Sequence, residues 1–150
     1  MRSDSEYGQA ERLAANPRHV RAALSAFFAI VGRWGLKTDE ARRLLGSPSE
    51  STYFNWKSKG VTSVSPDVMI RISYILGIAA LLERLFAAAP HRANAWIRQP
   101  NSGPLTRGRT ALDFLLDGGL VAMDELHGVL QSDVGAGAPV TTSPPTRVPA

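Results

Sequence analysis

Apolar residues recur at helical spacing along almost the whole chain, and prolines, glycines and capping residues divide them into short segments. Alternation with a period of two, which predicts strands, is not found in the sequence, and neither is an internal repeat. The sequence therefore predicts an all-α fold. With 150 residues, of which 44% are hydrophobic, the chain is long enough for one ordinary domain or two small ones.

A proline or a capping residue precedes most of the expected helices, and a glycine or a proline follows them. Helices are expected to begin at Pro17, after the caps Thr38 and Ser49, at Pro66, near His91 and after the cap Thr110. The first should end at Gly32 or Gly35, the second at Gly46, and the third at about Lys57, before Gly60. The sequence Asp-Gly-Gly at 117–119 is expected to separate the last two helices.

These boundaries predict five regions along the chain. Residues 1–16 are expected to be a flexible N-terminal segment, and residues 133–150 a low-complexity tail that is flexible when free. Between them, we expect a helix-turn-helix domain (17–65), a long joining and dimerisation helix (66–89) and a small helical domain (90–132). The joining helix carries an apolar stripe, and Gly77 within it indicates close helix packing or a slight bend. The stripe consists of Ile72, Ile75, Ala79, Leu82 and Phe86.

Two short helices around Gly46 predict a helix-turn-helix, whose second helix lies in the major groove of DNA. Because Tyr53 and Trp56 are three residues apart, both should face the core, whereas Phe54 should be exposed. The polar residues of this pair of helices are then either DNA contacts or simply a solvated face. The candidates for DNA contact are Glu50, Ser51, Thr52, Asn55, Lys57 and Lys59 on the second helix, with Arg42 and Arg43 on the first.

The surplus of positive charge lies near the N-terminus. Residues 1–60 contain ten Lys/Arg and six Asp/Glu, whereas residues 61–150 contain seven of each. Such a surplus attracts a phosphate backbone. However, four extra charges over this length are also common in proteins that bind no nucleic acid, so charge alone leaves both alternatives open.

Residue types that carry chemistry are missing or unsuitably spaced. The chain has no cysteine, which excludes thiol catalysis and fits a reducing cytoplasm. Its three histidines have no zinc-site spacing, and we find no nucleophile elbow or glycine-rich phosphate loop. The N-terminus lacks the apolar run of a signal peptide, and charges interrupt the longest apolar segment. We therefore expect a cytoplasmic, non-enzymatic protein with no metal, no cofactor and no membrane partner.

Two motifs, in this order, resemble one protein family. The first is "LLG" at 44–46 followed by Ser49, Thr52, Tyr53 and Trp56, which resembles the helix-turn-helix of Xre-like repressors. The second spans 93–130: a tryptophan, Pro-Asn, a loop with leucine and glycine, "Leu-x-x-Leu-Leu-x-x-Gly" and an apolar helix. This block is similar to the toxin-binding domain of Xre/MbcA/ParS-type antitoxins. The resemblance covers about residues 20–132.

The resemblance implies an antitoxin of a type II toxin–antitoxin system. Its partners would be the adjacently encoded RES-domain toxin, an NAD-degrading enzyme, and operator DNA, and the antitoxin would act as a homodimer. It would cover the toxin's active site with its C-terminal region and repress its own operon. The candidate toxin contacts are Trp96, Arg98, Pro100, Asn101, Arg107 and Arg109. Two alternatives remain: a stand-alone regulator whose C-terminal region only dimerises, or an adaptor that no longer binds DNA.

Overall fold

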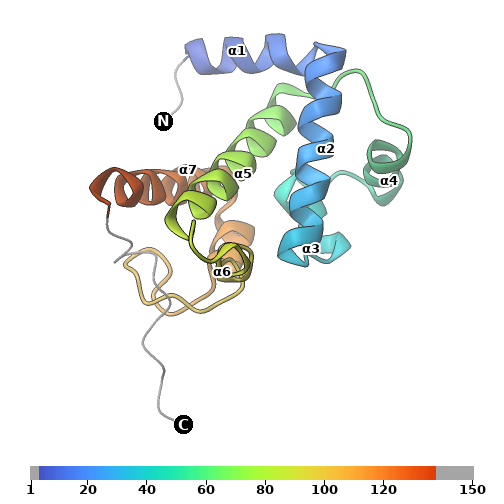
Figure 1. Ribbon diagram of the computed structural model, residues 1–150. Coiled ribbons are helices and arrows are strands. Elements are labelled where there is room, and N and C mark those ends of the chain that lie inside the picture. The colour runs from blue at the N-terminus through green and yellow to red at the C-terminus, as the bar shows by residue number, and fades with distance from the viewer. Residues whose placement is uncertain (1–3, 138–150) are drawn as a thin grey trace. The chain divides into compact units, whose positions relative to one another are not determined.

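The computed structural model describes residues 4–137, and its regular structure there is helical (Figure 1). This confirms the predicted all-α fold. Backbone contacts divide the chain into two compact units, Met1–Leu76 and Gly77–Ala150. The helices are α1 (Asp4–Ala14), α2 (Pro17–Trp34), α3 (Thr38–Leu44), α4 (Glu50–Ser58), α5 (Pro66–Leu85), α6 (Pro90–Trp96) and α7 (Ala111–Ala136). The division falls inside α5, so this helix contributes residues to both units.

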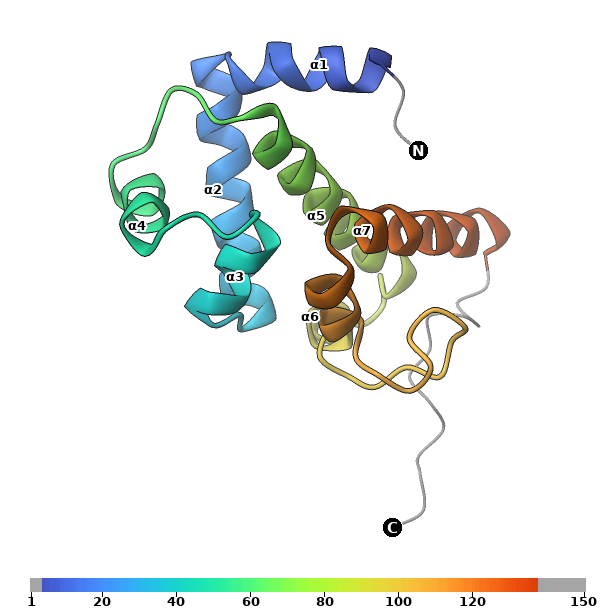
Figure 2. The same ribbon diagram turned by 180° about the vertical axis from the view of Figure 1, so that it is seen from behind.

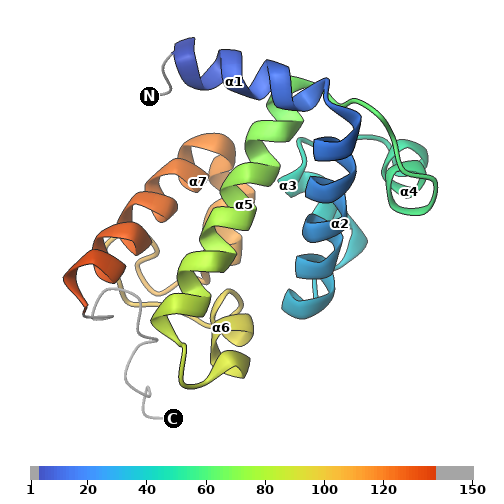
Figure 3. The ribbon, with the colours of Figure 1, turned by 45° about the horizontal axis from the view of Figure 1, so that its top comes forward.

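Helix α1 stands where the sequence predicted a flexible segment. Ala10 and Ala14 are buried, and the backbone N–H of Val64 donates to the carbonyl of Ala14 at 3.1 Å. Figure 3 shows α1 leading directly into α2, with the segment before α5 passing close to their junction. The prediction was therefore wrong for residues 4–14, because distant residues hold this helix in place. Residues 1–3 lie outside the described part of the chain.

Helix α2 is the central helix of the N-terminal unit and contacts both α1 and α4. The side chain of Asn16 caps it by accepting from the N–H of His19 at 3.2 Å. Of the two ends that the sequence allowed, the helix uses Gly35, which adopts a φ of 63°. The buried side of α2 consists of Val20, Ala23, Leu24, Phe27, Ile30 and Trp34.

In the C-terminal unit, α7 is broken inside its length. Gly119 has φ 61° and ψ −139°, so two helical segments meet there at an angle that Figure 2 shows clearly. This confirms the helix break predicted at residues 117–119. Thr110 caps the first segment, as predicted, by accepting from the N–H of Asp113 at 3.0 Å. The second segment continues through Ala136, so residues 133–136 belong to the helix and not to the expected tail; residues 138–150 lie outside the described residues.

The expected apolar stripe is buried at all five positions, of which four lie in α5 and the fifth, Phe86, directly follows it. Gly77 also has the predicted role at a close approach of two helices. A Cβ atom at this position would lie only 2.9 Å from Nε2 of His127 on α7. Any side chain at residue 77 would therefore displace the imidazole, which explains why the middle of an apolar helix contains a glycine. Among residues 4–137, no helix is both long and apolar enough to cross a membrane.

Candidate nucleic-acid interface

Helix α3 begins one residue earlier than the sequence predicted. Lys37, and not Thr38, occupies the cap position, and the N–H of Lys37 donates to Oε1 of Glu40 at 2.8 Å. Thr38 is the first residue of the helix. The carboxylates of Asp39 and Glu40 lie in the first turn, where their negative charges interact favourably with the positive end of the helix dipole. The error is a single residue and leaves the face of the helix unchanged.

The turn between α3 and α4 depends on Gly46. Its φ is +90°, and the N–H groups of Gly46 and Ser47 donate to the carbonyls of Arg43 (3.1 Å) and Arg42 (2.8 Å). These two bonds define a Schellman motif, which ends a helix with a residue in the left-handed region. The prediction that Gly46 stops the first helix of the pair is therefore confirmed.

Replacing Gly46 with alanine is expected to lower the free energy of unfolding by about 1–3 kcal/mol. The φ is unfavourable for any L side chain, and the new Cβ would lie 3.2 Å from Nε of Arg71, which is paired with Asp67 at 2.9 Å. Urea denaturation measures the change. Gly32→Ala is the matched control. Gly32 lies inside α2, and a Cβ atom added there would meet no neighbouring atom within 4 Å. This variant should therefore have a free energy of unfolding up to about 1 kcal/mol higher than the wild type. An equal loss in both variants would contradict the role of the turn.

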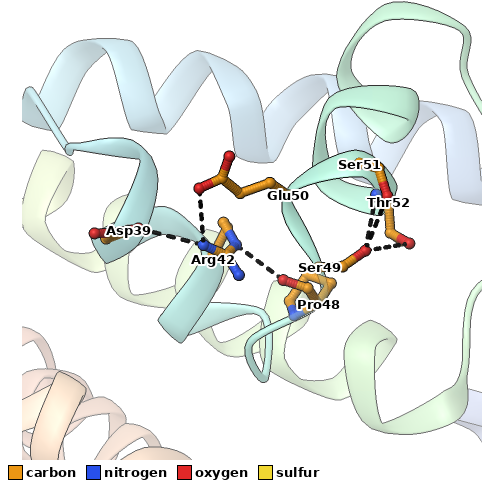
Figure 4. Close-up of polar contacts among 7 residues, drawn as sticks. All are labelled: Asp39, Arg42, Pro48, Ser49, Glu50, Ser51 and Thr52. Carbon is orange, nitrogen blue, oxygen red and sulfur yellow. Dashed lines mark hydrogen bonds and ion pairs between the residues drawn. The ribbon is translucent and has the colours of Figure 1, made fainter.

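Arg42 ties the two helices and the turn together (Figure 4). Its Nε donates to the carbonyl of Pro48 at 2.9 Å, and its Nη1 lies 3.3 Å from Oδ1 of Asp39 and 3.7 Å from Oε1 of Glu50. Only 23% of this side chain is exposed. The predicted phosphate contact of Arg42 stays a prediction, but these bonds also give the residue a role in positioning α4. That role could not be found from the sequence, because it depends on the path of the turn.

The N-terminus of α4 is capped as predicted. The Ser49 hydroxyl accepts from the N–H of Thr52 at 3.2 Å and lies within hydrogen-bond distance of the hydroxyls of Ser51 and Thr52. Figure 4 shows these three hydroxyl-bearing side chains gathered at the first turn. They are positioned by one another before any ligand is present. Ser51 as a whole is exposed to solvent.

Tyr53 fixes α4 on α2. It is 1% exposed, and its ring packs edge-on against Phe28 of α2 and against Phe54, with centroid distances of 5.4 and 5.3 Å. Phe54 is 45% exposed, as expected. Trp56 was predicted to be in the core with Tyr53, but it is only half-buried and lines a pocket between α2 and α4.

Burial raises the pKa of the Tyr53 phenol above its ordinary value of about 10. The folded state therefore holds this proton more tightly than the unfolded chain. Its contribution to stability is complete below pH 10 and is lost as the pH rises through the folded-state pKa. Urea denaturation between about pH 9 and pH 11 should show this loss, and Tyr53→Phe should reduce it. An unchanged slope in the phenylalanine variant would contradict the assignment.

Most of the predicted DNA contacts form an exposed polar surface on α3 and α4. Thr52 and Arg42 are partly buried, whereas the other six are exposed. The exposed residues are Arg43, Glu50, Ser51, Asn55, Lys57 and Lys59. Their side chains combine base-reading types near the start of α4 with lysines near its end, which is the order expected for a recognition helix.

The predicted toxin contacts in the C-terminal unit divide into two groups. Trp96 and Asn101 are each 2% exposed, so they are part of the core of the unit. The N–H of Asn101 donates to the carbonyl of Arg109 (3.0 Å), its carbonyl accepts from Gly108 (2.7 Å), and its Oδ1 accepts from Gly103 (2.7 Å). Asn101 therefore holds the loop between α6 and α7 in shape, as its predicted turn role requires.

The remaining four predicted toxin contacts lie at the surface of the same unit. They are Arg98, Pro100, Arg107 and Arg109. Arg107 adopts a φ of 51°, and Arg109 forms an ion pair with Asp117. An apolar pocket of about 150 Å³ lies between the loop and α7, and Leu105 and Val129 are among the residues that line it. The surface thus combines cations with an apolar depression. In the described part of the chain, no group of three or more side chains could hold a metal ion.

The fold and the arrangement of α3 and α4 define a helix-turn-helix protein, and comparison with known proteins gives its class. Residues 15–77 match the model of the antitoxin Xre-like helix-turn-helix domain. This match ends within one residue of the boundary between the two units. No solved structure matches the chain significantly.

A curated relative extends the comparison beyond this domain. A Sinorhizobium fredii protein, named uncharacterized protein y4oB, is 39% identical over 122 residues, which cover 81% of this chain and 92% of the relative. The chain therefore belongs to the same protein family as this relative. Since an alignment of that length must continue well past residue 77, the likeness includes part of the C-terminal unit.

Proposed function

We propose that the protein is the antitoxin of a type II toxin–antitoxin system. Its C-terminal residues 90–132 bind the RES-domain toxin encoded next to it and block that toxin's NAD-degrading active site. Its helix-turn-helix represses the shared operon, and the protein acts as a cytoplasmic homodimer within a larger complex. The observation that carries the proposal is the antitoxin Xre-like helix-turn-helix domain in residues 15–77, attached to a second compact unit.

The exposed surface of α4 supports operator binding. Ser51 and Asn55 are exposed and four residues apart, so they lie on one side of the helix. Asparagine can bond adenine through two atoms, and serine can bond several base edges. Lys57 and Lys59 follow at the end of the helix, where they suit phosphate groups.

The double variant Ser51→Ala, Asn55→Ala is expected to bind the operator about 10- to 100-fold more weakly. Both side chains are exposed, so the fold should persist and the toxin should still be neutralised. Mobility shift with the upstream operon DNA measures the first effect, and growth during toxin expression measures the second. Loss of both activities would mean that the two side chains support the fold. Unchanged operator binding would remove them from the interface.

The C-terminal unit supports a role as a plug. Its loop presents Arg98, Arg107 and Arg109 beside an apolar pocket, and such a combination suits a partner with acidic and apolar groups. A plug needs no chemistry of its own, because a buried interface excludes the substrate. Trp96 and Asn101 would act by holding the loop in shape, and the exposed residues would make the contact.

A stand-alone regulator whose C-terminal unit only dimerises is the second candidate. Co-expression with the product of the neighbouring gene separates the two functions. The antitoxin function predicts co-purification of the two proteins and protection of the cells. The antitoxin function is contradicted if the neighbouring gene encodes no RES-domain protein. It is also contradicted if the gene product does not bind this protein and is not neutralised by it. A mobility shift that remains negative for both the free protein and the complex would instead indicate an adaptor that does not bind DNA.

A further inference from the structure

A second pocket lies within the N-terminal unit, between α2 and the end of α4. It has a volume of about 310 Å³, which is at the lower end of the range for small-molecule sites. One face of α2 lines it at the spacing of successive helical turns, and the last turn of α4 lines another side. The lining residues are Arg21, Leu24, Ser25 and Phe28 from α2, with Trp56, Lys57 and Gly60 from α4 and the turn after it.

The pocket offers aromatic surface that the fold leaves accessible. Phe28 and Trp56 come from different helices, and both are only partly buried. Leu24, which is 3% exposed, also lines it. Aromatic rings at an accessible site favour a flat ring as a ligand, because stacking and apolar burial then act together.

The charges of the pocket are all positive. Arg21 and Lys57 are exposed, and no acidic side chain is among the lining residues. Within residues 4–137, neither cation forms an ion pair with a carboxylate. The two cations come from different helices and share one pocket with the Ser25 hydroxyl, so they can hold a single anionic group from two sides.

We propose that this pocket binds a free mononucleotide. The base lies against Phe28 and Trp56, and the phosphate lies between Arg21 and Lys57. A phosphate alone would not use the aromatic lining, and an apolar ligand would not use the two unpaired cations. The volume suits one base with one sugar phosphate. This site shares Lys57 with the proposed operator surface, but binding of a free nucleotide does not depend on toxin binding or on operator binding.

Tryptophan fluorescence provides the first test, with adenosine 5′-monophosphate as the probe. Trp34 and Trp96 are 3% and 2% exposed, whereas Trp56 is accessible, so a ligand in the pocket should quench Trp56. We expect saturable quenching that disappears in Trp56→Phe, and at least tenfold weaker binding of adenosine and of inorganic phosphate. The absence of saturation by about 10 mM, beyond the millimolar range of weak specific binding, would overturn the proposal.

Variants provide the second test, with binding measured by calorimetry. Arg21→Gln and Lys57→Gln should each weaken adenosine 5′-monophosphate binding at least tenfold. Arg18→Gln removes the same charge from an exposed position of α2 outside the pocket and should leave binding unchanged. Circular dichroism checks that each variant is folded. An equal loss in all three variants would mean that only general charge attracts the nucleotide, and the proposal would fail.

Duplex DNA provides the third arm, because a phosphate group could also come from a DNA backbone. A free-nucleotide site predicts that the protein binds adenosine 5′-monophosphate without DNA, with the variant effects given above. If Arg21→Gln weakens duplex binding while the wild-type protein does not bind the free nucleotide, the pocket is part of the DNA interface. That result would overturn the nucleotide site and leave the proposed operator binding intact.

Discussion

Replacing Trp96 with alanine is expected to lower the stability of the C-terminal unit by about 3–5 kcal/mol. The indole is 2% exposed and lies at the end of α6, beside the loop that Asn101 holds. Its removal leaves a large cavity under that loop. Since small domains have a total stability of only about 5–15 kcal/mol, the unit should lose a large fraction of its stability. Under the proposed function, the variant protein should protect cells from the toxin less well than the wild type.

The two internal methionines allow this experiment to resolve each unit. Met69 is 1% exposed in the N-terminal unit, and Met123 is fully buried in the C-terminal unit. With ¹³C-labelled methionine methyl groups, the Met123 signal of Trp96→Ala should move to its unfolded position at lower urea than in the wild type. The Met69 signal should change much less. Equal shifts would show that the units unfold as one body. Trp56→Ala, which truncates a half-buried tryptophan in the other unit, is the control and should leave Met123 unchanged.

Replacing Tyr53 with alanine should destabilise the N-terminal unit and leave the C-terminal unit largely unchanged, which is the reverse of the effect of Trp96→Ala. Tyr53 is 1% exposed and carries the ring contacts that fix α4 on α2. Truncation of a buried aromatic side chain costs about 3–5 kcal/mol, so the N-terminal unit should lose stability and the Met69 signal should report it. Operator binding should fall below detection in a mobility shift, because the helix that carries Ser51 and Asn55 is no longer held in place.

Tyr53→Phe is the matched control for this experiment. It keeps the ring that packs on Phe28 and removes only the hydroxyl group. Operator binding and the Met69 signal should therefore remain close to those of the wild type. A variant Tyr53→Ala that still binds the operator at full strength would mean that α4 is positioned by other contacts, such as those of Arg42 with Pro48 and Glu50.

Local signals in the sequence were sufficient for most of the fold. Capping residues and positive-φ glycines act within a few residues of their own position, so Ser49, Thr110 and Gly46 could be assigned before the structure was known. The break at Gly119 was predictable for the same reason. The close approach at Gly77 was also predictable, because a glycine inside an otherwise apolar helix is unfavourable unless it makes room for a neighbour.

Long-range contacts explain what the sequence did not predict. Helix α1 is anchored by Val64, fifty residues away, and its own composition is too polar to indicate burial. The guanidinium of Arg42 binds a carbonyl whose position depends on the turn. Trp96 and Asn101 were predicted as partner contacts, yet both are buried, and Asn101 makes its hydrogen bonds within its own loop. The pocket beside Trp56 was missed entirely, although Arg21, Leu24, Ser25 and Phe28 have the spacing of one helix face.

Under the proposed function, the hydrogen bonds of Asn101 have a consequence for how the partner-binding loop can diverge. Because these bonds fix the loop before any partner is present, little chain entropy is lost when a partner closes on it. Exposed side chains of the loop, such as that of Ser102, make none of these bonds. They can therefore be exchanged while the loop is retained. Under the proposed function, we expect related proteins to change partners by substitution at these surface positions.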